Sequence, residues 1–111
     1  MKTINVSEAT NTQLDWLVAK CEGLLPHDAW VKYGAVWWKD YVYSPTTDWS
    51  QMGPIIERER TQTRPMRGTE WEAYAGLYGG SGSGPTPLIA AARCYVMSKL
   101  GETVEVPDEL A

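Results

Sequence analysis

The chain has 111 residues, a length that suits one domain burying roughly two-thirds of the surface of its unfolded form. Its formal net charge of −4 argues against a general duplex-DNA binder held by phosphate contacts. Six tryptophans and six tyrosines occur with no phenylalanine, so every Trp and Tyr ring carries a polar group. Such side chains favour partly solvated surfaces and interfaces. We therefore expect a single aromatic-rich domain over residues 1–111.

The first predicted helix follows residues 1–7, which read as a short leader. Ser7 or Thr10 supplies a cap for this helix, and Gly23 supplies a stop. Between them, apolar side chains recur at the spacing of one helical face, at Leu14, Leu17, Val18 and Cys21.

Residues 30–43 are dominated by Trp, Tyr and Val, which is the composition of β-strands. Gly34 interrupts this run as a turn or a bulge, so the run forms either a hairpin or one bent strand. Ser44-Pro45 ends it, because proline lacks the N–H that continued strand pairing needs.

The stretch Ser44–Arg60, SPTTDWSQMGPIIERER, has no clean period across its first ten residues. Thr47 or Asp48 can cap a short helical turn that starts at Trp49. Gly53-Pro54 is expected to break this turn, and the residues after it to form a second short turn that leads into a strand.

That strand is expected to run through about Thr63, with a turn at 64–68 and a partner strand at Trp71–Tyr78. Gly79–Gly84 is the only low-complexity segment and reads as a flexible loop.

The last predicted helix begins with Thr86 as its cap and Pro87 at its first position, where a missing N–H costs nothing. It runs from Leu88 to Leu100, and Gly101 closes it. The acidic tail after it is expected to pack only through two valines, Val104 and Val106.

Both long helices have an apolar face, so they are expected to lie side by side on one face of a sheet. The predicted fold class is α+β, a two-layer sandwich of a three- to four-stranded antiparallel sheet and two helices.

No pattern of residues points to catalysis, a metal or a cofactor. His27 stands alone, and Cys21 and Cys94 lie in different predicted helices, so no metal-ligand spacing occurs. The two cysteines are expected to be reduced thiols, with a disulfide between the helices as the less favoured alternative. Asp48 with Glu57 or Glu59 could form an acid/base pair. We favour the alternative, in which Asp48 caps a turn and the two glutamates pair with Arg58 and Arg60.

Apolar stretches fall far short of the ~18–20 residues of a membrane span, and no signal peptide or lipidation motif is present. We therefore expect no membrane association.

Three features suggest a phosphorylated ligand. Four of the five arginines lie within ten residues, at Arg58, Arg60, Arg64 and Arg67, and the guanidinium group suits bidentate contact with phosphate. Interleaved glutamates equally fit a solvated strand edge protected by charge.

The second feature is the glycine-rich segment Gly79–Gly84, which leads into Thr86 and the start of the last helix. A helix N-terminus presents free N–H groups to an anion. The segment lacks the Gly-Lys-Ser/Thr ending of a nucleoside-triphosphate loop, and a plain cap explains Thr86 equally well.

The third feature is a group of rings, Trp37, Trp38, Tyr41, Tyr43 and Trp49, that surrounds the start of the 44–60 stretch. Nucleobases stack on such rings, although core filling accounts for about half of them.

Three segments carry a resemblance to a known family: LDWLVAKCEG (Leu14–Gly23), the stretch Ser44–Arg60 quoted above, and GPTPLIAAARCYVMSKLGETVEVP (Gly84–Pro107). In these segments, which span most of its length, the chain resembles the NinX-like family of small lambdoid-phage proteins. Residues 65–83 show no usable match. The resemblance implies a phage product that works in the cytoplasm of an infected bacterium, and it supplies no catalytic residues.

We therefore predict a non-enzymatic phage accessory protein, with a counter-defence or host-modulating role, that binds a small nucleotide-type ligand. The predicted site residues are Trp38, Tyr43, Thr47, Asp48, Trp49, Arg58, Arg60, Gly84 and Thr86. The alternatives are a protein–protein inhibitor or adaptor that grips a host enzyme through an exposed Trp/Tyr/Arg patch, and an enzyme that cleaves the same ligand. We also expect a homo-oligomer, because a small domain builds a deep pocket most easily across a symmetric interface.

Overall fold

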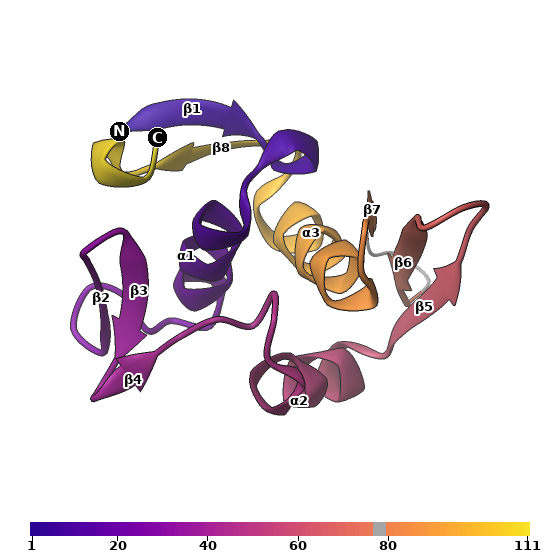
Figure 1. The fold of residues 1–111 in the computed structure, drawn as a ribbon, viewed down its shortest axis with the longest axis horizontal. Helices are drawn as coiled ribbons and strands as arrows, with labels where there is room; N and C mark the ends of the chain where they lie inside the picture. Colours follow the sequence, from indigo (N-terminus) through magenta and orange to yellow (C-terminus); the bar gives the residue numbers. More distant parts are fainter. Residues whose placement is uncertain (77–79) are drawn as a thin grey trace.

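The computed structural model describes residues 1–76 and 80–111, and in this part of the chain three helices lie among three small antiparallel sheets (Figure 1). The helices are α1 (Asn11–Cys21), α2 (Trp49–Glu59) and α3 (Pro87–Leu100). The first sheet pairs β1 (Lys2–Asn5) with β8 (Thr103–Val106). The second sheet contains β2 (Ala29–Lys32), β3 (Ala35–Trp38) and β4 (Tyr41–Val42), and the third contains β5 (Thr61–Pro65), β6 (Trp71–Ala75) and β7 (Ser81–Gly84). Two short 3₁₀ turns, η1 (Val6–Glu8) and η2 (Asp108–Leu110), complete the elements.

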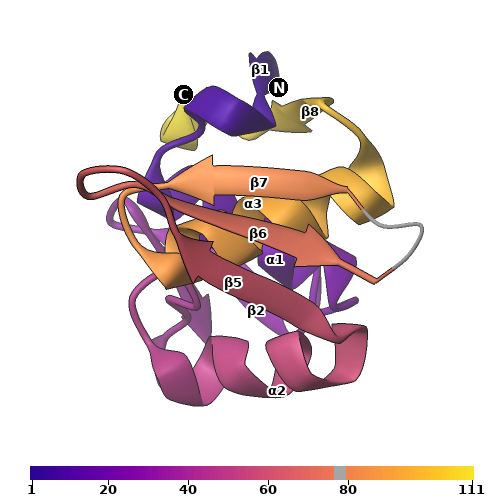
Figure 2. The same cartoon turned by 90° about the vertical axis from the view of Figure 1, so that its right-hand side faces the viewer.

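The helix α3 lies at the centre of the molecule, between α1 on one side and the β5–β6–β7 sheet on the other (Figures 1 and 2). Its three consecutive alanines, Ala90–Ala92, are fully buried. Because other elements cover α3 on several sides, its apolar side chains do not form a single stripe.

The local end signals of the helices are confirmed. Thr10 caps α1 through a reciprocal pair of hydrogen bonds with Gln13, and the Thr86 hydroxyl accepts a hydrogen bond from the Ile89 N–H at the start of α3. Asp48 caps α2 in the same way, accepting from the Ser50 N–H. Side-chain oxygens at these positions stabilise helix ends because the first N–H groups have no partner within the helix.

The helix α2 corrects the prediction that Gly53-Pro54 breaks the chain, because it continues through both residues to Glu59. Its apolar residues Met52 and Ile55 are buried, and Ile56 packs beside them, which is the spacing of one helical face. Burial of this face outweighs the one hydrogen bond that a proline removes.

The glycine-rich segment is also corrected, since Ser81–Gly84 forms the strand β7 rather than a flexible loop. A side chain at Gly82 would place its Cβ 2.5 Å from the backbone nitrogen of Cys94 and 2.6 Å from the carbonyl oxygen of Ala90. Glycine is therefore needed here so that the strand can pack directly on α3. Gly79, and the predicted strand end at Leu77 and Tyr78, lie outside the described residues.

The predicted leader and the tail pair with each other as β1 and β8, from Lys2 opposite Val106 to Asn5 opposite Thr103. The leader prediction was wrong because strand pairing depends on a partner about 100 residues away, which local sequence does not reveal. Burial of Val104 and Val106 is confirmed, but the tail does not pack through these valines alone, because Leu110 also packs against the core.

The α+β class is confirmed, but the two-layer sandwich is wrong in detail. The strands form three separate sheets instead of one, and α2 is an additional helix. Gly34 closes a hairpin between β2 and β3, with a φ of 71°. Within the described residues no helix is both long and apolar enough to cross a membrane.

Candidate functional site

The candidate site is a cavity of about 580 Å³ between the end of α1, the β2–β3–β4 sheet and the first half of α2. This volume lies in the range of small-molecule sites, roughly 300–1,000 Å³. The lining residues are Glu22 and Leu24 from the end of α1, Trp38, Tyr41 and Tyr43 from the sheet and the residue after it, and Asp48, Ser50, Gln51, Pro54 and Ile55 from α2 and its cap.

The sheet provides a wall of three rings. Trp38 and Tyr41 are paired across β3 and β4, which places both side chains on the same face. The Trp38 ring lies 5.6 Å from the Tyr41 ring and 5.8 Å from the Tyr43 ring, in edge-to-face arrangements with interplanar angles of 66° and 88°. Such contacts hold the rings in place before any ligand arrives.

The hydroxyl group of Tyr43 is kept protonated. Burial, followed by the negative charge of Glu22, raises the pKa of Tyr43 well above its ordinary value. At neutral pH this hydroxyl is therefore a hydrogen-bond donor.

Gln51 joins the end of the sheet to α2. Its side-chain oxygen accepts a hydrogen bond from the Ser44 N–H at 2.6 Å, and its amide nitrogen donates to the Val42 carbonyl oxygen at 3.3 Å. The glutamine therefore fixes the relative position of two sides of the cavity.

A buried carboxylate holds the segment that connects these two sides. Asp15 on α1 accepts hydrogen bonds from the N–H of Thr46 at 3.0 Å and from its hydroxyl at 2.8 Å. Burial raises the pKa of Asp15 to about 6, and the two hydrogen bonds from Thr46 oppose this rise. The sequence signal for this contact is an aspartate between two apolar positions of the first helix, Leu14 and Trp16.

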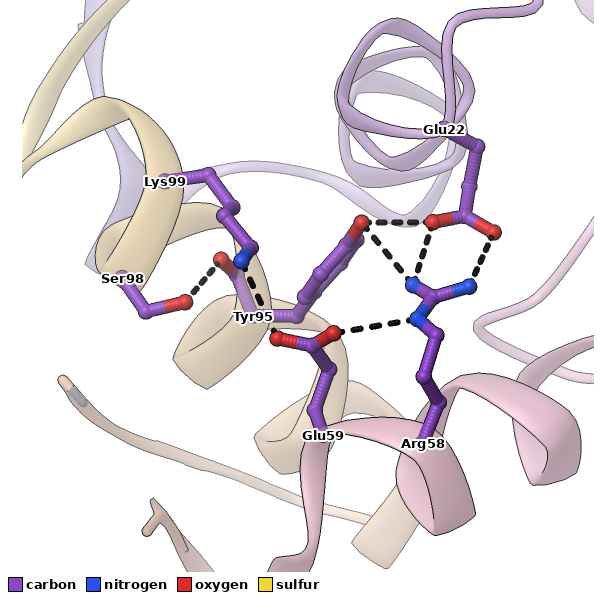
Figure 3. A network of polar contacts seen from close by, with 6 residues as sticks. All are labelled: Glu22, Arg58, Glu59, Tyr95, Ser98 and Lys99. Carbon is purple, nitrogen blue, oxygen red and sulfur yellow. Dashed lines mark hydrogen bonds and ion pairs between the residues drawn. The ribbon is translucent and has the colours of Figure 1, made fainter. Parts of the chain in front are cut away.

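A network of polar contacts joins the three helices beside the cavity (Figure 3). The Arg58 guanidinium donates to both carboxylate oxygens of Glu22, at 3.1 and 2.6 Å, and to Glu59 at 3.0 Å. The Tyr95 hydroxyl donates to Glu22 and accepts from Arg58, and the Lys99 ammonium lies 3.1 Å from Glu59.

The network sets the protonation of its members. Hydrogen bonds to Glu22 and Glu59 raise the pKa of Arg58. Partial burial raises the pKa of Glu22, but the hydrogen bonds from Arg58 and Tyr95 together outweigh it and lower the pKa overall. Arg58 therefore stays charged, and most of its N–H groups are already occupied by protein acceptors.

A second, more open depression adjoins the cavity. It has a volume of about 680 Å³, is lined by Pro54, Glu57, Arg58 and Arg60, and shares Pro54 with the aromatic cavity. Arg60 follows the end of α2 in the left-handed region, with a φ of 54°. Its side chain is exposed and forms no ion pair with any residue that the structure describes.

The predicted site residues fall into three groups. Trp38, Tyr43 and Asp48 line the cavity, and Arg58 and Arg60 line the second depression. The remaining four predicted residues, Thr47, Trp49, Gly84 and Thr86, line neither hollow.

Local structure explains two of the four residues outside the two hollows, Gly84 and Thr86. Trp49 is 57% exposed at the start of α2. Thr86 is a helix cap, and Gly84 allows close packing on α3, since a Cβ there would lie 2.7 Å from the Ile89 side chain.

Sequence reasoning missed Glu22 and Gln51 because both follow from tertiary contacts. Glu22 is the cap residue at the end of α1 and reaches the cavity only because α2 packs beside it. Gln51 had no distinguishing neighbour in the sequence.

The other reactive groups of the described chain do not assemble into a second site. No group of three or more metal-binding side chains comes together within residues 1–76 and 80–111. Cys21 and Cys94 are free thiols, and burial raises the pKa of each to about 11.

A family model described as Bacteriophage P22, NinX matches residues 5–99. The chain belongs to the NinX family. This confirms the resemblance and extends it through residues 65–83. The matched range holds the whole lining of the aromatic cavity, the Arg58 network and Arg60, so the candidate site lies within the NinX part of the chain. No curated protein matches the chain.

Proposed function

We propose that this NinX-family protein is a non-enzymatic phage accessory protein that binds a small nucleotide-type ligand in the host cytoplasm, with a counter-defence or host-modulating role. In the proposed complex, the base lies against Trp38, Tyr41 and Tyr43, and the phosphate lies over Arg60. The observation that carries the proposal is that a ring-lined cavity and an arginine-lined depression adjoin at Pro54.

The charges around the two hollows support this orientation. Two carboxylates, Glu22 and Asp48, line the aromatic cavity, so a phosphate placed inside it would be repelled. A neutral base meets no such repulsion, and each stacked base contributes roughly 1–3 kcal/mol. The phosphate therefore points outward.

Arg60 is the better phosphate ligand of the two arginines. A phosphate that approached Arg58 would compete with Glu22 and Glu59, which already accept its hydrogen bonds. Arg60 has a solvated guanidinium and forms no ion pair with any described residue, although the Glu57 carboxylate lines the same depression. Arg58 instead holds the Glu22 side of the cavity in place.

The state of the reactive groups supports a binding role over a catalytic one. The Asp48 carboxylate accepts hydrogen bonds from both the N–H and the hydroxyl of Ser50, at 2.9 and 2.6 Å, as a helix cap. The cysteines are protonated at neutral pH. General acid–base chemistry needs a group positioned to exchange a proton with the substrate, whereas Asp48 is engaged as a helix cap and the two thiols are neutral.

Calorimetric titration with a panel of cyclic and linear nucleotides, and with the matching nucleosides, tests the proposal. We expect Tyr41→Ala to weaken nucleotide binding about tenfold or more through loss of one stacked ring. Arg60→Gln is expected to lower the affinity for nucleotides to that for nucleosides. The matched controls are Trp49→Ala and Arg67→Gln, which change exposed residues outside both hollows and keep the wild-type affinity. Silence across the whole panel refutes nucleotide binding.

Two further measurements separate the alternatives. Chromatography of each nucleotide after incubation with the protein reports any cleavage, and turnover identifies an enzyme. Affinity capture from host lysate reports a stoichiometric protein partner, and such a partner without nucleotide binding identifies an inhibitor or adaptor.

A further inference from the structure

The Tyr43 side chain brings an unpartnered hydroxyl group to the aromatic cavity. Tyr43 lines the cavity and is only 3% exposed. Its hydroxyl forms no hydrogen bond with any residue that the structure describes, and it is not among the polar atoms that these residues seal off from solvent. Buried hydroxyl groups normally find a partner, so this one is available to a ligand. Because the raised pKa of Tyr43 keeps it protonated, it offers the cavity a hydrogen-bond donor.

The Glu22 carboxylate provides an acceptor near this hydroxyl. Its negative charge contributes to the raised pKa of Tyr43, so the two groups lie within electrostatic reach of each other. The Oε2 atom of Glu22 accepts hydrogen bonds from Arg58 and Tyr95, whereas Oε1 accepts a single one from the described residues, from Arg58 at 3.1 Å. A carboxylate oxygen has two lone pairs, so Oε1 retains one for a ligand.

The other side chains of the cavity make its acceptors stronger than its donors. Asp48 uses Oδ1 for both hydrogen bonds from Ser50, and its Oδ2 accepts none from the described residues. The donors of the lining, from its tyrosines, tryptophan, serine and glutamine, are all neutral. The Lys39 ammonium lies 5.3 Å from the centre of the Trp38 ring, but Lys39 does not line the cavity. Because hydrogen bonds to charged groups are roughly twice as strong as neutral ones, the two carboxylates favour a base that donates N–H groups and repel carbonyl oxygens.

An amino group beside an unprotonated ring nitrogen matches this arrangement. The amino group donates hydrogen bonds to the carboxylate oxygens, and the ring nitrogen accepts one from the hydroxyl. Adenine has this edge and no carbonyl oxygen, whereas guanine, cytosine, uracil and hypoxanthine all carry a carbonyl oxygen. The hydrogen-bonding groups of the cavity therefore distinguish adenine from the oxo bases.

The orientation of the rings allows this contact. The Tyr43 ring stands at 88° to the Trp38 ring. A base stacked on Trp38 therefore meets Tyr43 at its edge, where its hydrogen-bonding groups lie.

We propose that the aromatic cavity recognises an adenine base, with the Tyr43 hydroxyl donating to a ring nitrogen and Glu22 Oε1 accepting from the amino group. This inference rests on the proposed nucleotide binding and names the base that the cavity takes. Tyr43 and Glu22 are then the residues that determine specificity, while Trp38 supplies affinity for any base through stacking.

Calorimetric titration of the full chain with AMP and IMP tests the recognition, because the two nucleotides share their ribose and phosphate and differ only at the amino edge. AMP is expected to bind about tenfold or more tightly than IMP. The N6,N6-dimethyl derivative of AMP keeps the ring nitrogens but has lost both N–H groups. It is expected to bind as weakly as IMP.

Two variants test the residues. Tyr43→Phe keeps the ring, and it is expected to bring the ratio of AMP to IMP affinity towards one. Tyr33→Phe is the matched control, since it removes the hydroxyl of a tyrosine that is 88% exposed and outside both hollows, and it keeps the wild-type ratio. Glu22→Gln is also expected to lower the ratio, because an amide can donate to the carbonyl oxygen of IMP. The ratio isolates base recognition from any general loss of affinity that follows from weaker contacts with Arg58.

The outcomes separate this inference from nucleotide binding itself. Equal affinities for AMP and IMP overturn the inference and leave nucleotide binding in place, as does tighter binding of GMP, CMP or UMP than of AMP. A ratio that keeps its wild-type value in Tyr43→Phe or in Glu22→Gln also overturns it. Silence with all of these nucleotides refutes the proposed function, and this inference with it.

Discussion

Replacing Asp15 by asparagine should flatten the pH dependence of stability between about pH 5 and pH 7. Asp15 is only 7% exposed, and burial raises its pKa from an ordinary value of 3.8 to about 6, against the hydrogen bonds from Thr46. The folded protein therefore binds this proton more tightly than the unfolded chain does. The resulting stabilisation is complete below pH 3.8 and is lost as the pH rises through about 6.

The size of the effect follows from the two pKa values. Ionising the buried carboxyl costs roughly 3 kcal/mol of folding free energy at neutral pH, and roughly 1 kcal/mol is regained when the pH falls to about 5. Glu22 and Glu59, whose pKa values are lowered, act in the opposite direction as the pH falls further. They are common to both proteins, so the difference between the two pH profiles isolates Asp15.

Urea unfolding followed by tryptophan fluorescence, at several pH values, measures both profiles. The asparagine oxygen can still accept the hydrogen bonds from Thr46, so the comparison concerns the slopes and not the absolute stabilities. Asp40→Asn, at an exposed carboxyl in the turn between β3 and β4, is expected to keep the wild-type slope. Parallel profiles for the wild-type protein and Asp15→Asn would show that the buried carboxyl is not what makes stability fall towards neutral pH.

Three further outcomes test the packing and the network. Gly82→Ala should lower the free energy of unfolding by about 1–3 kcal/mol, because the new Cβ meets the α3 backbone. Gly53→Ala, whose Cβ meets nothing within 4 Å, should raise it by about 0.5–1 kcal/mol in helix α2. Equal effects of the two variants in denaturant unfolding would contradict the tight packing of β7 on α3. Tyr95→Phe should lower the free energy of unfolding by about 1–2 kcal/mol, because it removes the hydroxyl that links the Glu22 carboxylate to the Arg58 guanidinium. An unchanged unfolding midpoint would show that this link does not stabilise the fold. Cys94, fully buried and with its pKa raised to about 11, should react with a thiol reagent only on unfolding, and rapid modification of the native protein would contradict its burial.

The aromatic part of the candidate site could be predicted further than its polar part. Trp38 and Tyr43 are predicted near the site, because the core cannot bury every ring of a strand this rich in aromatic residues, and both line the cavity. Local sequence does not distinguish Trp49 from these two rings. Trp49 points elsewhere because Asp48 begins a helix there, and the direction of each side chain in the first turn depends on how that helix is docked.

Local sequence also does not predict which arginines are available to a ligand. The arginine cluster is plain in the sequence, yet Arg58 is bound by carboxylates from α1 and α2 while Arg60, two residues later, is free of ion pairs among the described residues. No local pattern separates them. The difference arises because α1 ends beside α2 and Glu22 meets only one of the two side chains.

The sequence by itself located the features that act over a few residues: a cap at Ser7 or Thr10, a cap at Thr47 or Asp48, the cap at Thr86, a turn or bulge at Gly34 and the apolar face of α1. The structure selects Thr10, Asp48 and a hairpin turn from these alternatives. Caps, turns and helical periodicity depend on neighbours in the chain, so local sequence is sufficient. The tertiary structure alone decided that Gly53-Pro54 stays helical, that the glycine-rich segment becomes a strand, and that the two ends of the chain pair. Each of these depends on a surface formed by residues distant in sequence, whose burial outweighs the weak local preference.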